Sequence, residues 1–581
     1  MSQATISPVT VDLAPLQEYL PTVASRGRTM LLPALHHAQS LYGWLPEAVQ
    51  REISFALRVP LADVHGVIEF YTMFYSEPTA KRVIRVCEDP ACSLAGGHQL
   101  MAALEAQLSL QPGETASDGS VTYEHVPCLG MCELAPCALN GERPAGQLTP
   151  ADIPAFLAGE HPEPVAQPYG QPRWLLKRVG VVDPASLADY QAHGGYEALP
   201  RALGMAADAL IAEVEGFGIL GRGGAMFPLG RKWRFTRAVE APADTKHIVV
   251  NADESEPGTF KDRVLMEEDP FALIEAMTIA GYAVGAENGW IFVRGEYPRC
   301  FQRLQVAVAA ARSAGLLGRN ILGHDGFHFD IEIRQGAGAY ICGEETALFE
   351  AIEGKRGFPR IKPPYPPNSG LFHQPTAINN VETLVAMLAA MNVGGEAWRA
   401  QGTENSPGTK LFCLSGQVAR PGVYELPFGA TIAEVIAMAG GVTGSGTLQG
   451  VLMGGAAGIF VGPEQLDMPL TYEASRQHGV PLGSGVIMVF SDAVDMRQPL
   501  YELARFFAHE SCGKCFPCQL GSQRQMEILD RIANQSDAHG QDKAALLDLG
   551  FTMTETSLCG LGQTAASAVL SAIKLWPELV E

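Results

Sequence analysis

Two sets of cysteines carry the most specific chemistry in this sequence. In the C-terminal part, three cysteines are separated by gaps of two residues, and a fourth follows about forty residues later. A cubane [4Fe–4S] cluster needs four converging thiolates, and such gaps let one loop supply three of them. A structural zinc site is the alternative, but zinc sites more often pair two separate knuckles. The spacing therefore predicts a [4Fe–4S] cluster, with Cys512, Cys515, Cys518 and Cys559 as its ligands.

The second set consists of two looser pairs, with gaps of four and three residues. Each pair follows a short β-rich run, 82–86 or 121–126, so both pairs are expected at strand ends. A [2Fe–2S] cluster needs two thiolates for each iron, which two separate pairs can supply. A four-cysteine zinc site fits the spacing about equally well. The four expected ligands of this site are Cys87, Cys92, Cys128 and Cys132.

The other four of the twelve cysteines do not fit these sets. Cys137 is close to the second set, but it follows Pro136 and exceeds the required count, so we expect a buried small hydrophobic residue. For Cys300, Cys342 and Cys413 packing is the default role, because each is isolated in the sequence.

A glycine-rich segment, 221–237, reverses the charge of this acidic chain locally, with five basic residues and no acid. Backbone N–H groups freed by glycine, together with Lys and Arg, can seat a phosphate. Phe227 and Phe235 in the segment offer rings that can stack on a flat group. An ordinary basic loop is the alternative. The segment does not match the G-x-G-x-x-G fingerprint, so a Rossmann site is not supported.

Two acidic segments adjoin regular elements. The segment 251–263 directly follows an expected strand, where α/β proteins tend to bind ligands, and its Asn and carboxylates can hold ribityl or ribose hydroxyls. Solvated surface acids are the alternative. The segment 343–346 opens an expected helix that can end at Gly354, and acids in a first turn normally complement the helix dipole.

Composition and charge exclude several classes of protein. The chain has 581 residues, 47% of them apolar, so several domains are expected. A formal charge of −22 disfavours nucleic acid and anionic lipid as partners. The longest uncharged apolar stretch, 384–393, is too short to span a bilayer. The N-terminus has no secretory signal pattern, so we expect the cytoplasm.

The pattern along the chain predicts an α/β multidomain protein. Apolar residues recur at helical spacing over the first 75 residues. In the central part, strands at 248–250 and 290–293 flank a helix at 271–284, and 327–334 alternates as a half-buried strand does. The later part turns into short β segments with one helix at 432–439. The expected domains are a helical cap with a cluster domain (1–160), a Pro-rich linker (161–175), an α/β domain (176–408), a small α+β module (409–492) and a helical cluster domain (493–581).

Several of these motifs, in this order, match a family. Residues 81–140 are similar to the thioredoxin-like [2Fe–2S] subunit of respiratory complex I. Residues 174–581 resemble the flavin-bearing, NADH-oxidising subunit of that complex, through GRGGAMFPLGRKW, NADESEPGTFKDR, GAYICGEETAL, RIKPPYPPNSG, INNVETL and ESCGKCFPC. The two units fused in one chain resemble the flavin, or large diaphorase, subunit of soluble NAD-reducing [NiFe]-hydrogenases. Equivalent subunits of NAD-dependent formate dehydrogenases and of complex I-type dehydrogenases are the alternatives.

The resemblance implies the site residues position by position. Met226 departs from it, because the family usually has glycine there, and Tyr365 stands where phenylalanine is common. The 409–492 module would match the β-grasp segment of the family, for which no ligand is implied. The implied FMN contacts are Gly221, Gly223, Lys232, Asn251, Asp253, Tyr340, Gly343, Glu344, Asn379, Asn380 and Thr383. The implied NAD contacts are Phe227, Phe235, Glu256, Glu345, Lys362 and Tyr365, with Glu256 and Glu345 nearest the reacting ring.

The resemblance implies a diaphorase that exchanges hydride with NAD(H) and single electrons with the clusters, because a flavin can do both. The partners implied are a small iron–sulfur diaphorase subunit and [NiFe]-hydrogenase subunits, with no nucleic acid and no membrane span. Two other hypotheses stay open on the residues alone. One is a zinc-stabilised scaffold without catalysis, and the other is an iron–sulfur relay whose flavin site is vacant.

Overall fold

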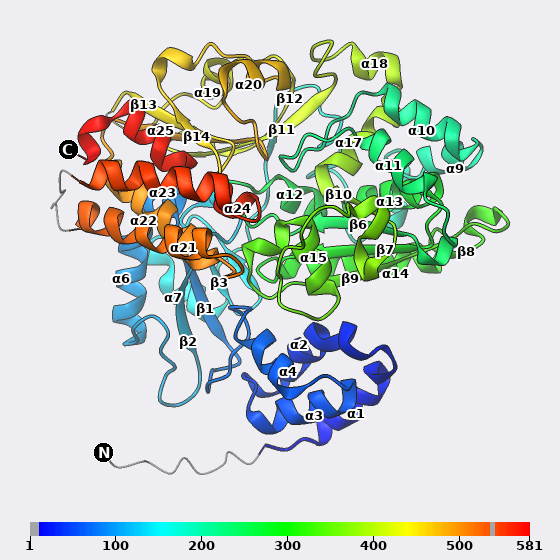
Figure 1. Cartoon of the computed structure of the whole chain (residues 1–581), viewed down its shortest axis with the longest axis horizontal. Helices are drawn as coiled ribbons and strands as arrows, with labels where there is room; N and C mark the ends of the chain where they lie inside the picture. The colour runs from blue at the N-terminus through cyan, green and yellow to red at the C-terminus, as the bar shows by residue number, and fades with distance from the viewer. Residues whose placement is uncertain (1–10, 445, 535–540, 581) are drawn as a thin grey trace.

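The computed structural model describes residues 11–444, 446–534 and 541–580. Its described residues form three β-sheets, with helical segments at both ends of the chain (Figure 1). This is the α/β multidomain architecture that the sequence predicted.

The N-terminal segment is helical, as expected from its apolar spacing. Its helices pack their apolar residues into the same hydrophobic core as the central domain. The loop that follows them is hydrogen-bonded to the central domain, since the backbone N–H groups of Thr72 and Met73 donate to the carbonyls of Gly338 and Ala337. The four helices are α1 (Ala14–Val23), α2 (Leu31–Tyr42), α3 (Glu47–Leu57) and α4 (Leu61–Ile68).

The next domain has a four-stranded sheet in the order β2–β1–β3–β4, with β1 and β2 parallel and the others antiparallel. It has a small core of its own, which includes Ile84, Leu100 and Phe156. Cys87 is the last residue of β1, and Cys128 follows β2 closely, so the strand-end prediction is confirmed for both. The elements are β1 (Val83–Cys87), α5 (Pro90–Leu94), α6 (Gly97–Leu108), β2 (Thr122–Val126), β3 (Ala138–Asn140), β4 (Arg143–Ala145) and α7 (Ile153–Ala158).

The central domain is built on a sheet in the order β10–β6–β7–β9–β8, in which only the short β8 is antiparallel. The carboxyl ends of β6 and β10 lie side by side, so the polar residues that follow both strands meet at one edge. The strands are β6 (His247–Ala252), β7 (Asn288–Val293), β8 (Gly318–Arg319), β9 (His328–Gln335) and β10 (Thr376–Asn380). The main helices are α8 (Leu187–Ala192), α9 (Ala198–Leu203), α10 (Ala207–Gly216), α11 (Leu229–Ala238), α12 (Lys261–Glu268), α13 (Pro270–Val284), α14 (Pro298–Ser313), α15 (Glu345–Ile352), α16 (Pro366–Ser369), α17 (Val381–Val393) and α18 (Gly395–Arg399).

Strand β9 is more covered than its alternating pattern predicted. Phe329 and Ile331 are buried as expected, but Arg334 on the opposite face is only 4% exposed. Its Nη1 donates to the carbonyl of Thr29, 2.6 Å away, in the N-terminal helical segment. The prediction of a half-buried strand is therefore wrong at this end, because a segment distant in sequence covers the polar face.

The fourth part is a mixed six-stranded sheet in the order β14–β13–β15–β11–β12–β5. Its edge strand β5 (Pro168–Tyr169) comes from the Pro-rich segment 161–175 and pairs with β12. The predicted helix at 432–439 is present as α19 (Ile432–Met438), and a second helix, α20 (Tyr472–His478), was not foreseen. The other strands are β11 (Thr409–Gly416), β12 (Gly422–Pro427), β13 (Leu448–Met453), β14 (Ile459–Val461) and β15 (Val486–Ser491).

The C-terminal helices, orange and red in Figure 1, lie between the four-stranded domain and the six-stranded module. Arg505 donates to the carbonyl of Glu88 on one side, and Ser571 accepts from the N–H of Phe460 on the other. Within the described ranges, no helix is both long and apolar enough to cross a membrane. The helices are α21 (Arg497–Glu510), α22 (Phe516–Asn534), α23 (Asp542–Thr556), α24 (Gly560–Thr564) and α25 (Ser567–Leu575).

Candidate functional site

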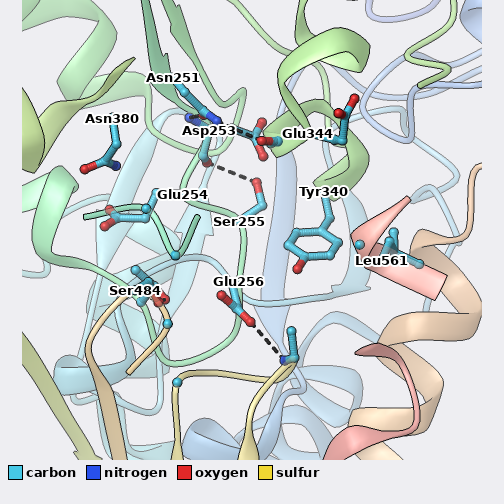
Figure 2. Close-up of a pocket in the computed structure, with 18 of the residues that line it drawn as sticks. Asn251, Asp253, Glu254, Ser255, Glu256, Tyr340, Glu344, Asn380, Ser484 and Leu561 are labelled. Carbon is cyan, nitrogen blue, oxygen red and sulfur yellow. Dashed lines mark hydrogen bonds between the residues drawn. The ribbon is translucent and has the colours of Figure 1, made fainter. Parts of the chain in front are cut away.

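Two adjoining cavities open at the carboxyl edge of the central sheet. Their volumes are about 470 and 350 Å³. They share six lining residues, so together they form one long cleft. Figure 2 shows the larger cavity, with Asn251 and Asp253 at one end and Glu256 at the other. The shared residues are Gly223, Asn251, Gly343, Glu344, Asn380 and Gly560.

The residues after β6 form one wall of the larger cavity. Asn251 is fixed by a hydrogen bond from its Nδ2 to the carbonyl of Gly343, 2.8 Å away. Asp253 is buried, and its Oδ2 has no hydrogen-bond partner among the described residues. Burial raises the pKa of Asp253 well above its usual range. A buried polar atom without a partner needs one from a ligand or water, so this carboxyl fits a ligand hydroxyl.

Glycines let the backbone come close to this cleft. A Cβ on Gly223 would lie 3.3 Å from Cβ of Asn380, and a Cβ on Gly343 would lie 3.3 Å from Oδ2 of Asp253. Both contacts are tight, so a side chain at either position would narrow the space for a flat ligand. The glycine-rich segment thus lies against the 379–380 strand end, and Gly343 of the 343–346 segment lies against Asp253.

Charged residues at the start of α15 and in the loop that follows this helix line the smaller cavity. Lys362 pairs with Glu344 at 2.8 Å and with Glu345 at 2.6 Å. Glu344 also caps α15, since its side chain accepts from the N–H groups of Thr346 and Ala347. The helix-cap alternative therefore holds for Glu344, while Glu345 forms an ion pair with Lys362. The other predicted residues that line this cavity are Gly221, Phe227, Lys232, Asn379 and Thr383.

Two predicted nucleotide contacts lie outside both cavities. Phe235 is 47% exposed, and its ring centroid is 6.3 Å from that of Phe227, which itself lines the smaller cavity. Tyr365 is 57% exposed and precedes α16. Phe235 thus lies at the rim of the cleft beside Phe227, and Tyr365 is exposed outside both cavities.

Met226, which departs from the family pattern, has a φ of 52°. This left-handed conformation is one that glycine adopts without cost and that other residues rarely adopt. The backbone at this position therefore keeps the shape that the usual glycine favours, although a methionine occupies it.

Two walls of the larger cavity were not predicted from the sequence. One comes from the six-stranded module, and Ala457 in it donates its N–H to Oε1 of Glu256, 2.9 Å away (Figure 2). Burial raises the pKa of Glu256 to about 7. The glycine runs near 454 and 483 were the only sequence signal for this wall. The missed residues are Gly454, Ala457, Gly458, Pro481, Gly483 and Ser484 from the module, and Gly560, Leu561 and Thr564 from the C-terminal domain.

A buried ionic group supports the floor of the larger cavity. Lys261 lies 2.9 Å from Asp262 and 3.1 Å from Glu382, and Lys410 lies 3.4 Å from Glu382. Asp262 in turn accepts from Nδ2 of Asn380 at 2.6 Å. The predicted flavin contact Asn380 is thus oriented by charges that sequence spacing did not single out.

The four cysteines of the C-terminal set line one small cavity. Two of its other lining residues, Ile341 and Leu561, also line the larger cavity of the cleft. The thiol site and the cleft are therefore separated by a single layer of apolar side chains. Figure 2 shows Leu561 near Tyr340 among the residues that line the larger cavity.

The cysteines of the N-terminal set also converge. The sulfurs of Cys128 and Cys132 are 3.3 Å apart. The sulfurs of Cys87, Cys92 and Cys137 all lie within 4.8 Å of one another. Cys137 is buried, as predicted, but its neighbours are thiols rather than only apolar side chains. These thiols fit an iron–sulfur cluster, since such a cluster is bound by cysteine thiolates and the site supplies enough of them.

A ligand cleft with a glycine cradle, one thiol site behind a shared wall and a second thiol site in the four-stranded domain fit an iron–sulfur flavoprotein. Comparisons with known proteins agree with this class. Residues 214–389 match the Nuo51 FMN-binding domain, and 16–160 match the thioredoxin-like [2Fe-2S] ferredoxin. Residues 411–455 match the SLBB domain, and 499–581 match the NADH-ubiquinone oxidoreductase-F iron-sulfur binding region.

Individual relatives are similar over most of the chain. The F subunit of NADH-quinone oxidoreductase from Aquifex aeolicus is 43% identical over 408 residues, which are 70% of this chain and 92% of the relative. The alpha subunit of NAD-reducing hydrogenase HoxS from Cupriavidus necator is 34% identical over 571 residues, 95% of this chain and 92% of the relative. A crystal structure of NAD+-reducing [NiFe]-hydrogenase in the air-oxidised state matches with a TM-score of 0.84 at 34% identity, covering 96% of this chain and 94% of that chain.

The chain belongs to the family of NADH-binding flavin subunits that includes the F subunit of NADH-quinone oxidoreductase and the alpha subunit of NAD-reducing hydrogenase. It carries the family's FMN-binding domain and both iron–sulfur domains. The expected small α+β module is confirmed as an SLBB domain.

Proposed function

We propose that this chain is the diaphorase subunit of an NAD-reducing hydrogenase, in which it exchanges electrons between NAD(H) and a partner that carries out the hydrogen chemistry. The observation that carries the proposal is the layer of Ile341 and Leu561 shared by the cleft and the C-terminal thiol site. A flavin, when bound, exchanges a hydride with nicotinamide and single electrons with iron–sulfur clusters. The alignment with the alpha subunit of HoxS along 95% of the chain supports the hydrogenase assignment.

Residues of both cavities bind and orient the flavin in this proposal. The unpartnered Oδ2 of Asp253 accepts a hydrogen bond from the polar side chain of the flavin. The amide of Asn251 donates a hydrogen bond to the same chain. Asn380, held by Asp262, lines both cavities from the opposite strand. Tyr340 and Leu561 exclude water on the side of the thiol site, which keeps the space between the two sites apolar. The remaining flavin contacts are Gly221, Gly223, Lys232, Gly343, Glu344, Asn379 and Thr383.

The nucleotide occupies the outer part of the cleft. Lys362 attracts the pyrophosphate, and Glu345, paired with Lys362, fixes the position of that lysine. Phe227 lines the smaller cavity and offers a stacking face, while Phe235 and Tyr365 extend the aromatic rim. Glu256 closes the other end of the cleft, next to the SLBB wall. No side chain needs to transfer a proton for hydride transfer itself, so the protein contributes orientation.

The metal ligands follow from the converging thiols. Cys512, Cys515, Cys518 and Cys559 hold a [4Fe–4S] cluster, and Cys87, Cys92, Cys128 and Cys132 hold a [2Fe–2S] cluster. We place the protein in the cytoplasm, because twelve cysteines used mainly as cluster ligands suit a reducing compartment.

A partner surface lies beside the C-terminal cluster site. Phe516 follows Cys515 directly, and Phe516 and Leu520 are exposed one turn apart on α22. Leu547 and Phe551 repeat this spacing on α23, which packs against α22. Exposed large apolar side chains that cluster in this way mark interaction sites. We assign this surface to the iron–sulfur subunit that accepts the electrons.

Isolation of the native complex tests the proposal. The hydrogenase assignment predicts co-purification with a nickel-containing chain, FMN on acid extraction, and reduction of NAD+ by hydrogen. A complex with quinone reductase activity and no nickel would instead support the complex I-type assignment, which the 43% identity to the NADH-quinone oxidoreductase relative favours. A molybdenum-containing partner would support a formate dehydrogenase, and protein that contains zinc but no iron or flavin would refute all three.

The partner surface has a test of its own. Replacing Phe516 and Phe551 by serine should reduce the amount of co-purified iron–sulfur subunit while leaving FMN content unchanged. Phe55→Ser is the matched control, since Phe55 is also strongly exposed but lies on the distant α3. Equal losses in both variants would contradict the assignment of this surface.

A further inference from the structure

The thioredoxin-like domain holds five buried thiols around a cluster that needs four. Cys92 and Cys137 have their sulfurs 3.6 Å apart, and Cys128 and Cys132 have theirs 3.3 Å apart. Cys87 lies within 4.8 Å of both Cys92 and Cys137. We call the iron that Cys87 and Cys92 would bind the first iron, and the iron that Cys128 and Cys132 would bind the second iron. The first iron has three thiols within reach, whereas it binds only two thiolates besides its bridging sulfides.

The pairing of β1 with β3 fixes the position of Cys137. Strands β1 and β3 are antiparallel, with Val86 opposite Ala138. The same register puts Cys87 opposite Cys137, and the N–H of Cys87 donates to the carbonyl of Cys137 at 3.2 Å. Residues opposite each other on adjacent strands bring their side chains together when these point to the same face. The backbone therefore holds Cys137 next to a proposed cluster ligand.

The separation of Cys92 and Cys137 places both sulfurs within reach of the same metal position. Two sulfurs bonded to one tetrahedral metal at about 2.3 Å lie about 3.8 Å apart. The Cys92–Cys137 distance of 3.6 Å is close to that value. A cysteine that serves only to pack has no need to be this near two ligands.

The loop that carries Cys128 and Cys132, on the other side of the cluster site, offers no additional thiol among the described residues and is held by several hydrogen bonds. The loop that carries Cys128 and Cys132 is fixed by the flavin domain, because Arg294 donates to the carbonyl of Cys128 at 2.6 Å and Arg263 to that of Gly130 at 2.9 Å. Asp89 also accepts from the N–H of Cys128. The second iron therefore has a rigid pair of ligands, and the additional thiol is on the side of the first iron.

We propose that Cys137 is an exchange ligand of the [2Fe–2S] cluster, which binds the first iron in place of Cys92. In the exchange the iron–sulfur bond to Cys92 breaks and one to Cys137 forms. The proton leaves the Cys137 thiol and is taken up by the Cys92 thiolate, and no electron is transferred. The chain thereby keeps four thiolates on the cluster when the iron–sulfur bond to Cys92 breaks. This inference rests on the proposed iron–sulfur assignment of the site.

Alanine variants of the whole complex test the exchange, because alanine offers no oxygen that could replace a thiolate. Cys92→Ala should retain most of the [2Fe–2S] iron, sulfide and electron paramagnetic resonance signal, and Cys137→Ala should retain all of them. The double variant should retain less than a tenth. Cys132→Ala is the matched control, and it should lose the cluster even with Cys137 present. Iron and sulfide counts and the resonance spectrum do not depend on catalytic activity.

Each outcome decides the question. If Cys92→Ala loses the cluster as completely as the double variant does, the proposal is overturned. Loss in Cys137→Ala alone would make Cys137 an obligatory ligand and would also overturn the exchange. FMN and [4Fe–4S] contents serve as the folding control, since those sites lie in other domains. Zinc without iron at this site in the wild-type complex would refute the [2Fe–2S] assignment itself, which is a different result from loss in a variant.

Discussion

The buried ionic group below the flavin cavity gives the sharpest prediction. Lys261 is fully buried between the carboxylates of Asp262 and Glu382, at 2.9 and 3.1 Å. Lys261→Met removes the cation and keeps a side chain of similar length. Both carboxylates then remain in the interior without their nearest positive partner.

The expected cost follows from that geometry. Removing one member of a buried ion pair typically destabilises a protein by about 3–5 kcal/mol, because the remaining charge is left uncompensated. Lys410 still opposes Glu382 at 3.4 Å, so the main uncompensated charge is that of Asp262. We therefore expect the lower end of this range, about 3 kcal/mol. Because Asp262 also holds Asn380, the variant should bind flavin more weakly.

Urea denaturation followed by tryptophan fluorescence measures the cost, since Trp233 and Trp398 are buried in the flavin domain. Lys355→Met is the matched control. Lys355 also pairs with two carboxylates, Glu350 and Glu353, but its side chain is 38% exposed. An exposed pair contributes only about 0–1 kcal/mol. If the two variants lose the same free energy of unfolding, the ionic group does not support the cavity as we argue.

Three further predictions concern the redox sites. Glu345→Gln should lower kcat/KM for NADH about tenfold, because Lys362 loses one of its two carboxylate partners, while FMN and iron contents stay at the wild-type level; a loss of iron would show that α15 is wrongly placed. Glu256, with a pKa of about 7, is neutral below that pH and charged above it. A carboxylate favours the cationic ring of NAD+ over neutral NADH, so the preference for NAD+ should rise as the pH passes from about 6 to about 8. Binding titrations check this, and a Glu256→Gln variant with the same pH dependence would exclude the carboxylate as its cause. Cys559→Ala should abolish the [4Fe–4S] signal and spare both FMN and the [2Fe–2S] signal, and loss of all three would indicate misfolding of the chain.

The sequence was informative wherever the determinant is local. Three cysteines with two-residue gaps must lie on one loop, and a run such as 248–250 forms a strand because its apolar residues need burial on both faces of a parallel sheet. The strand-end positions of Cys87 and Asn251 follow from the same local patterns. Long motifs then identified the family, since they preserve the order of many such local features.

Contacts between segments that are distant in the sequence could not be predicted from local sequence patterns. Arg334 was expected on an exposed face, but the N-terminal helices cover it. Cys137 was assigned to packing, because the register that sets it opposite Cys87 depends on how β1 and β3 pair. The SLBB wall at Ala457 had no signal except glycine runs, which also occur in ordinary turns.

The amino-acid sequence by itself thus determined the kinds of groups available: two sets of thiolates, a basic glycine-rich loop and carboxylates after a strand. Only the tertiary structure decided which of them meet, because spacing along the chain constrains neighbours within a few residues and not the packing of one domain on another. The wall of Ile341 and Leu561 between cleft and thiols joins residues more than two hundred positions apart. Its existence depends on the docking of the C-terminal helices against the central sheet, and so does the route for electrons.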